Sequence, residues 1–85
     1  GSLDGAIEFF TQSIQLDPGY YDAYVYLGMA LFKKKRDQEA LSALSRAIEI
    51  DPEREWAKLK IAEFKKVIEK ESKQKKKNNR KSLGC

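Results

Sequence analysis

The fold is decided by residues 21–54, which read YDAYVYLGMALFKKKRDQEALSALSRAIEIDPER. Apolar residues in the first half recur three and four positions apart, as on one face of a helix. They are Ala23, Leu27, Ala30 and Leu31, and the second half repeats the spacing at Leu41, Leu44 and Ile48. The polar run 33–36 separates the two halves, and Pro52 ends the second. The stretch therefore predicts two antiparallel helices joined by a short turn.

The same pattern recurs outside this stretch at an offset of 34 residues. Asp17-Pro18 returns as Asp51-Pro52. Other apolar or small positions match at this offset: Ala6 with Ala40, Ile7 with Leu41, Phe10 with Leu44, Ile14 with Ile48, Ala23 with Ala57, and Val25 with Leu59. Matches at one offset along the chain indicate an internal repeat. We expect an all-α chain of four helices, near 3–16, 20–34, 37–50 and 53–70, with Asp37 as the N-cap of the third.

Composition excludes several kinds of site. The 85 residues include no His and one Cys, Cys85, so that imidazole catalysis, His or Cys zinc sites and internal disulfides are not possible. Ser42 and Ser45 have no neighbouring base to make them nucleophiles. No Gly-rich phosphate loop or metal-ligand spacing occurs. We therefore expect no catalytic residues, no cofactor and no metal.

The sequence also contains no predicted membrane span and no predicted signal peptide. No apolar run reaches the roughly 18–20 residues of a membrane span. The first residues lack the basic start and apolar core of a signal peptide. Together with the lack of disulfides, this predicts a cytoplasmic or nuclear protein.

Positive charge is concentrated at one end of the chain. Residues 1–69 carry 10 Lys or Arg and 12 Asp or Glu, whereas residues 70–85 carry 7 and 1. The basic residues of this tail are Lys70, Lys73, Lys75, Lys76, Lys77, Arg80 and Lys81. We expect a helical module over residues 1–69 and a basic tail over residues 70–85 that is either disordered or an extension of the last helix.

The stretch 21–54 resembles one tetratricopeptide repeat, whose 34-residue pattern is W-x2-L-G-x2-Y, then A-x3-F, then P. Leu27, Gly28, Ala40 and Pro52 match the pattern, and Tyr24, Leu31 and Leu44 are apolar replacements. Residues 3–18 resemble the second half of a preceding repeat. Residues 55–70 resemble the first helix of a following one, although Lys58, Ile61, Ala62 and Lys65 stand where Trp, Leu, Gly and Tyr are usual.

The resemblance implies antiparallel helical hairpins stacked as a short right-handed solenoid. The repeat positions are then expected to pack the core rather than to bind a ligand. They are Ala6, Phe10, Pro18, Tyr24, Leu27, Gly28, Leu31, Ala40, Leu44, Ala47 and Pro52. Gly28 costs a helix about 1 kcal/mol relative to Ala, and a helix tolerates that where another helix comes close.

In this family the first helix of each repeat lines a concave groove, so the resemblance implies a partner-binding surface here. Its expected residues are Val25, Tyr26, Met29, Phe32, Lys33, Trp56, Leu59, Glu63 and Lys66. An apolar stripe of Val25, Met29 and Phe32 suits an amphipathic helix or an extended peptide of a partner. The alternative is that Trp56 and the last helix fold over this stripe and bury it.

We therefore expect a protein–protein interaction scaffold without turnover. The first alternative is self-association, for example as a homodimer, because a helix at 3–16 without its usual repeat partner exposes Ile7, Phe9, Phe10 and Ile14. The second alternative is that the basic tail binds nucleic acid or an acidic partner. The charge balance of residues 1–69 gives nucleic-acid binding no support, so we do not expect it of the module.

Overall fold

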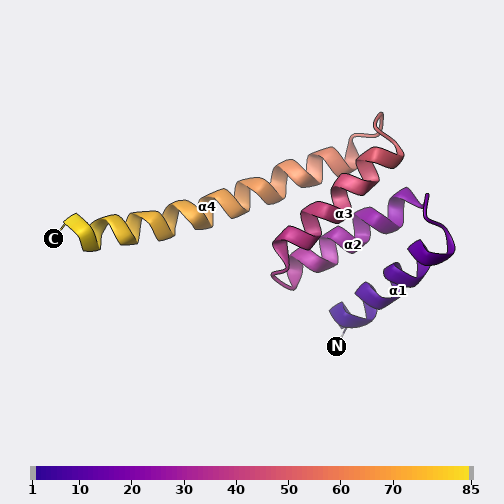
Figure 1. Ribbon diagram of the computed structural model, residues 1–85, viewed down its shortest axis with the longest axis horizontal. Helices are drawn as coiled ribbons and strands as arrows, with labels where there is room; N and C mark the ends of the chain where they lie inside the picture. The colour runs from indigo at the N-terminus through magenta and orange to yellow at the C-terminus, as the bar shows by residue number, and fades with distance from the viewer. Residues whose placement is uncertain (1, 85) are drawn as a thin grey trace.

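The computed structural model describes the backbone of residues 2–84 and the side chains of residues 3–71. The chain forms four helices: α1 (Ser2–Leu16), α2 (Tyr21–Lys33), α3 (Asp37–Ile50) and α4 (Trp56–Gly84). No strand occurs between residues 2 and 84. Successive helices turn back on one another, as Figure 1 shows. This arrangement confirms the prediction of an all-α fold made of antiparallel helical hairpins.

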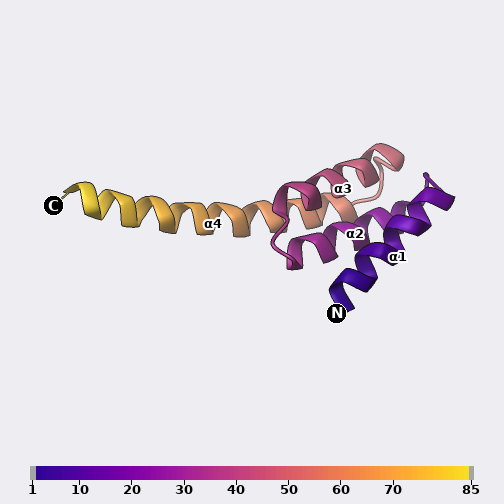
Figure 2. The same cartoon turned by 60° about the horizontal axis from the view of Figure 1, so that its bottom comes forward.

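The helix α2 lies at the centre of the structure. It contacts α1, α3 and α4, and α3 also contacts α4. Both views place α1 and α3 on opposite sides of α2 (Figures 1 and 2). Each helix therefore packs against its neighbours in the sequence, which is the contact pattern of a repeat stack.

Two turns related by the 34-residue offset end the first and third helices. In the turn after α1, Asp17 Oδ1 accepts a hydrogen bond of 3.2 Å from the Gly19 backbone N–H. In the turn after α3, Asp51 Oδ1 accepts one of 3.3 Å from the backbone N–H of Glu53. Because Pro52 and the two residues after it belong to this turn, α4 begins at Trp56 rather than near residue 53.

The turn between α2 and α3 comprises residues 34–36, one residue fewer than the polar run 33–36. The backbone N–H of Arg36 donates to the Leu31 carbonyl at 3.0 Å, and that of Lys35 donates to the Phe32 carbonyl at 3.0 Å. Lys35 has a φ of 69°, so these bonds form a Schellman motif with a left-handed residue after the helix. Asp37 is the first residue of α3, and Arg36 holds the cap position. The prediction of Asp37 as the N-cap is therefore wrong, because this motif already reverses the chain one residue earlier.

The helices α2 and α3 approach one another closely at Gly28. Gly28 is buried, and a Cβ added to it would lie 2.9 Å from Leu44 Cγ and 3.1 Å from the Ala40 carbonyl oxygen. Leu44, Ala40 and Ala47 are all fully buried. The small residues on both helices let the two backbones approach, as their spacing in the sequence implied.

The backbone of α4 runs on to Gly84 and projects beyond the other helices (Figure 1). Side chains are described only as far as Glu71, so the side chains of Lys73, Lys75, Lys76, Lys77, Arg80 and Lys81, and the whole of Cys85, lie outside the described residues. The division of the chain into a module over 1–69 and a tail over 70–85 stays a prediction.

Candidate partner-binding surface

All three members of the expected apolar stripe pack against other helices. Val25 is fully buried at the junction of α2 with α3 and α4. The ring of Phe32 stacks on that of Phe64 from α4, with centroids 3.9 Å apart and planes 3° from parallel. Met29 also packs, half-buried, against the same cluster. The helix α4 therefore covers much of this stripe, as the alternative interpretation of the sequence supposed.

A row of aromatic rings runs from α1 across α2 to the start of α4. Phe10 stacks on Tyr26 with centroids 5.4 Å apart, and Tyr26 meets the edge of Trp56 at 5.2 Å. Aromatic pairs of this kind contribute about 0.5–1.5 kcal/mol beyond the area that they bury. Tyr26 remains 43% exposed despite both contacts. The row thus presents an aromatic surface in which Tyr26 packs between two neighbouring rings.

The beginning of α4 is held against the beginning of α2. The Tyr21 hydroxyl accepts a buried hydrogen bond of 2.9 Å from the backbone N–H of Ala57. Arg54 lies over the Tyr21 ring at 4.8 Å and pairs with Asp22 at 2.9 Å. Because the first backbone N–H groups of a helix have no partner within it, the Tyr21 bond satisfies one that would otherwise be buried unpaired. These contacts set the position of Trp56 in the aromatic row.

An exposed surface remains along α2 and α4, and we call this surface the α2–α4 face. Its residues are Tyr26, Met29, Lys33, Trp56, Leu59, Glu63, Lys66 and Val67. Leu59 is 58% exposed and Val67 41% exposed, while Lys33, Glu63 and Lys66 are exposed polar neighbours. Glu63, Lys66 and Val67 also line a shallow hollow with Glu69 and Lys70. The face therefore combines an aromatic end with an apolar and charged end.

The repeat positions predicted from the sequence are buried or half-buried wherever they lie within helices. Gly28, Leu31, Ala40, Leu44 and Ala47 are buried, and the others within helices are half-buried. Those half-buried positions are Ala6, Phe10, Tyr24 and Leu27. Pro18 and Pro52 are exposed in the two related turns. Of the tail, Lys70 is exposed, and the side chains of its other cations lie outside the described residues.

The outer side of α1 carries a second exposed apolar surface. Phe9 is 63% exposed and Leu16 is 89% exposed. Ile7, by contrast, packs half-buried against Leu31 and its neighbours on α2. The sequence predicted Ile7, Phe9, Phe10 and Ile14 on an exposed end, but only Phe9 of these four is exposed. Ile7 and Phe10 contact α2, and Ile14 is half-buried.

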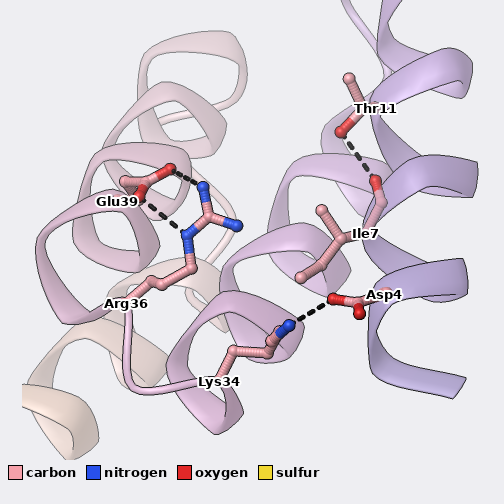
Figure 3. A network of polar contacts seen from close by, with 6 residues as sticks. All are labelled: Asp4, Ile7, Thr11, Lys34, Arg36 and Glu39. Atoms are coloured by element: carbon pink, nitrogen blue, oxygen red, sulfur yellow. Dashed lines mark hydrogen bonds and ion pairs between the residues drawn. The ribbon is translucent and has the colours of Figure 1, made fainter. Parts of the chain in front are cut away.

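Ion pairs stabilise the contact between α1 and the end of α2, and the start of α3. Lys34, at the end of α2, pairs with Asp4 in the first turn of α1, and Arg36 binds Glu39 through two hydrogen bonds of 2.9 and 2.7 Å (Figure 3). The hydrogen bond and positive charge of Lys34 lower the pKa of the Asp4 carboxyl below its ordinary value. Glu39 likewise raises the pKa of Arg36. Figure 3 also shows the Thr11 hydroxyl donating to the Ile7 carbonyl, a bond of 2.7 Å within α1.

Among the side chains of residues 3–71, no group of three or more acidic or sulfur ligands is arranged to hold a metal ion. In the same described part of the chain, no helix is both long and apolar enough to cross a bilayer.

Sequence reasoning missed two residues that shape this surface. Phe64 is 9% exposed and forms the stack with Phe32, and Tyr21 caps α4. The repeat offset contained a signal for Phe64, because it aligns Phe64 with buried Ala30.

Comparison with known proteins and the packing of the helices indicate the same repeat fold. The family profile described as "Tetratricopeptide repeat" matches residues 1–69. The chain is 38% identical over 68 residues to the "Small glutamine-rich tetratricopeptide repeat-containing protein 2" of Mycosarcoma maydis; the match covers 80% of this chain and 19% of that protein. No solved structure matches significantly. Because the profile covers most of the chain and the hairpins pack as its repeat requires, the chain belongs to the tetratricopeptide repeat family.

Proposed function

We propose that the chain binds a peptide or helix of a partner protein along the α2–α4 face. Its family is one of non-catalytic protein-interaction repeats. The observation that carries the proposal is the exposure of two side chains: Tyr26, which lies between Phe10 and Trp56 yet is 43% exposed, and Leu59, which follows Trp56 on α4 and is 58% exposed. Rigid aromatic anchors beside exposed apolar side chains are typical of binding hot spots.

The surface chemistry supports an amphipathic partner. Tyr26, Trp56, Leu59 and Val67 offer apolar area, and the cations Lys33 and Lys66 both lie near the Phe32–Phe64 stack, at the end away from the aromatic row. An occupant with apolar residues on one side and a few acidic residues beside them satisfies both features. The mechanism is burial of complementary surface, with no turnover. We also propose that this takes place in the cytoplasm or nucleus, which microscopy of the tagged full-length protein tests.

The proposal is tested with peptides selected from a random display library against the chain. Leu59→Asp and Val67→Asp place charge on the α2–α4 face at side chains that are already exposed, so the fold is retained. Fluorescence anisotropy should show at least tenfold weaker binding of the selected peptides to these variants. Leu16→Asp is the matched control, because Leu16 is exposed on α1 outside this face. Equal binding by all three variants, or loss only with Leu16→Asp, would contradict the proposal.

A further inference from the structure

Cations recur at helical spacing along the part of α4 that projects past the other three helices (Figures 1 and 2). An α-helix turns by about 100° per residue, so residues three or four positions apart lie on the same side of it. Six cations between residues 66 and 81 follow this spacing. Their positions fall within an arc of about 100° around the helix axis. We call this set the basic stripe, and its members are Lys66, Lys70, Lys73, Lys77, Arg80 and Lys81.

Acidic residues offset this charge only at the start of the stripe. Glu69 and Glu71 stand on either side of Lys70 in the sequence. Glu71 is the last acidic residue, and residues 72–85 contain six cations. With a rise of about 1.5 Å per residue, the stripe extends for about 22 Å along α4. The helix therefore presents a long row of positive charge, and most of that row has no carboxylate near it in the sequence.

The stripe does not help the helix to form. Like charges four residues apart on a helix repel one another and destabilise it. Lys73 stands four residues before Lys77, which stands four residues before Lys81. Lys66 and Lys70, whose side chains are described, are both exposed. Because this arrangement works against the helix, it indicates a partner of opposite charge rather than a role in folding.

The composition around the stripe distinguishes between anionic partners. Residues 69–82 contain no apolar side chain, so this stretch has no apolar face to insert into a membrane interface. An acidic protein would form exposed ion pairs, which are individually weak and screened by salt. A nucleic-acid duplex binds clustered cations more strongly, because its closely spaced phosphates release condensed counterions on binding. The sequence has no aromatic residue after Phe64, so the stretch that carries the stripe has no ring on which the bases of a single strand could stack.

We propose that the basic stripe binds the phosphate backbone of a nucleic-acid duplex, independently of base sequence. All members of the stripe except Arg80 are lysines, whose ammonium groups act on phosphates as point charges and carry no base readout there. The length of about 22 Å corresponds to about six base pairs of a duplex. Duplex binding does not depend on peptide binding at the α2–α4 face, with which the stripe shares Lys66.

The test is a titration of the intact chain into a fluorescently labelled DNA duplex of about 20 base pairs, followed by anisotropy over a salt series. Reducing agent keeps Cys85 from forming disulfides. Phosphate contacts by all members of the stripe predict that log K falls with log salt with a slope of about −5. The corresponding single strand should bind more weakly. An RNA duplex of the same sequence shows whether the B-form or the A-form is preferred, and binding to either duplex supports the proposal.

Two charge-matched variants separate the stripe from net charge. Lys73→Gln with Lys77→Gln removes two charges from the stripe, so it should weaken duplex binding at least tenfold at low salt and make the slope shallower by about 2. Lys65→Gln with Lys75→Gln is the control, because Lys65 and Lys75 lie about 100° and about 180° around the helix from Lys66. The control should bind the duplex as the wild type does. Both variants should retain binding of the selected peptides, and circular dichroism checks their helicity.

Three results would overturn the proposal. The first is a salt slope shallower than about −2, which would mean that few phosphates are contacted. The second is an equal loss in both variants, which would mean that net charge alone attracts the duplex. The third is tighter binding to the single strand, to poly-glutamate or to phosphatidylserine vesicles than to the duplex at the same salt. Loss of peptide binding alone, with duplex binding as described, would contradict the proposed function and leave duplex binding supported.

Discussion

At the scale of single residues, the α2–α3 hairpin depends on one missing side chain. Gly28 lies where an added Cβ would be 2.9 Å from Leu44 Cγ, which is closer than such atoms normally approach. Leu44 is fully buried and cannot move aside easily, and the other near atom is the backbone oxygen of Ala40. The loss of helix propensity at Gly28 is therefore offset by the packing that it permits.

This predicts that the same substitution has opposite effects at two glycines. Gly28→Ala should lower the free energy of unfolding by about 1–3 kcal/mol, because overpacking outweighs the gain in helix propensity. Gly5→Ala should raise it by up to about 1 kcal/mol, because Gly5 is helical and exposed, with no atom within 4 Å of an added Cβ. Urea unfolding followed by circular dichroism measures both. Stabilisation by Gly28→Ala would contradict the close approach of the two helices.

Phe32 distinguishes a core residue from a binding residue. Because its ring stacks on that of Phe64 at 3.9 Å, Phe32→Ala should lower the free energy of unfolding by about 2–4 kcal/mol. Leu59→Ala, at an exposed position on the α2–α4 face, should change it by less than about 0.5 kcal/mol. The same urea experiment applies. A Phe32→Ala variant with unchanged stability would show that α4 does not cover this part of α2.

At the scale of elements, the hairpin turn contains a residue in an unfavourable conformation. Lys35 has a φ of 69°, a left-handed conformation that costs a residue with a Cβ about 1–2 kcal/mol and that glycine adopts freely. The Schellman bonds from the backbone N–H groups of Lys35 and Arg36 hold it there. Neither bond involves the Lys35 side chain.

Lys35→Gly should therefore raise the free energy of unfolding, by up to about 1 kcal/mol after the added freedom of the unfolded chain is counted. Lys33→Gly is the control, because Lys33 lies within α2, where glycine costs about 1 kcal/mol. Thermal unfolding should thus give midpoints on opposite sides of the wild type. Destabilisation by both substitutions would mean that residue 35 is not left-handed.

The contact between α1 and the end of α2 should depend on pH. Lys34 lowers the pKa of Asp4 in the folded chain, so the folded state favours the ionised carboxylate. The stabilisation is present above the unfolded pKa of about 3.9 and is lost as the pH falls through the lower folded value. Asp4→Asn should therefore lower the urea midpoint slightly at pH 7 and leave it unchanged near pH 2. A difference that persists at pH 2 would show that Asp4 acts through something other than its charge.

The sequence predicted the elements better than their contacts. Apolar spacing and the two Asp-Pro turns are local, and they located all four helices, while Gly28 marked a close approach of α2 and α3. The stack of Phe32 on Phe64 and the row Phe10–Tyr26–Trp56 join helices whose relative rotation no local pattern determines. For this reason the sequence predicted Val25 and Phe32 in the groove, whereas in the structure both residues pack against α4.

At the scale of the whole molecule, each helix packs on its sequence neighbours, and α2 also meets α4. The energetics of such a stack are roughly a sum over units and the interfaces between them. The α2–α4 face follows from this arrangement, because α2 and α4 contact one another.

The most direct test of the central claim is to titrate a selected peptide into the isotope-labelled chain and follow its amide and indole signals by nuclear magnetic resonance. Trp56 is the only tryptophan, so its indole signal reports on the α2–α4 face without ambiguity. We expect the largest shifts at Trp56, Tyr26, Met29 and Leu59, with α3 nearly unchanged. Saturable binding whose shifts are confined to residues 37–50, with the Trp56 indole unmoved, would contradict the account.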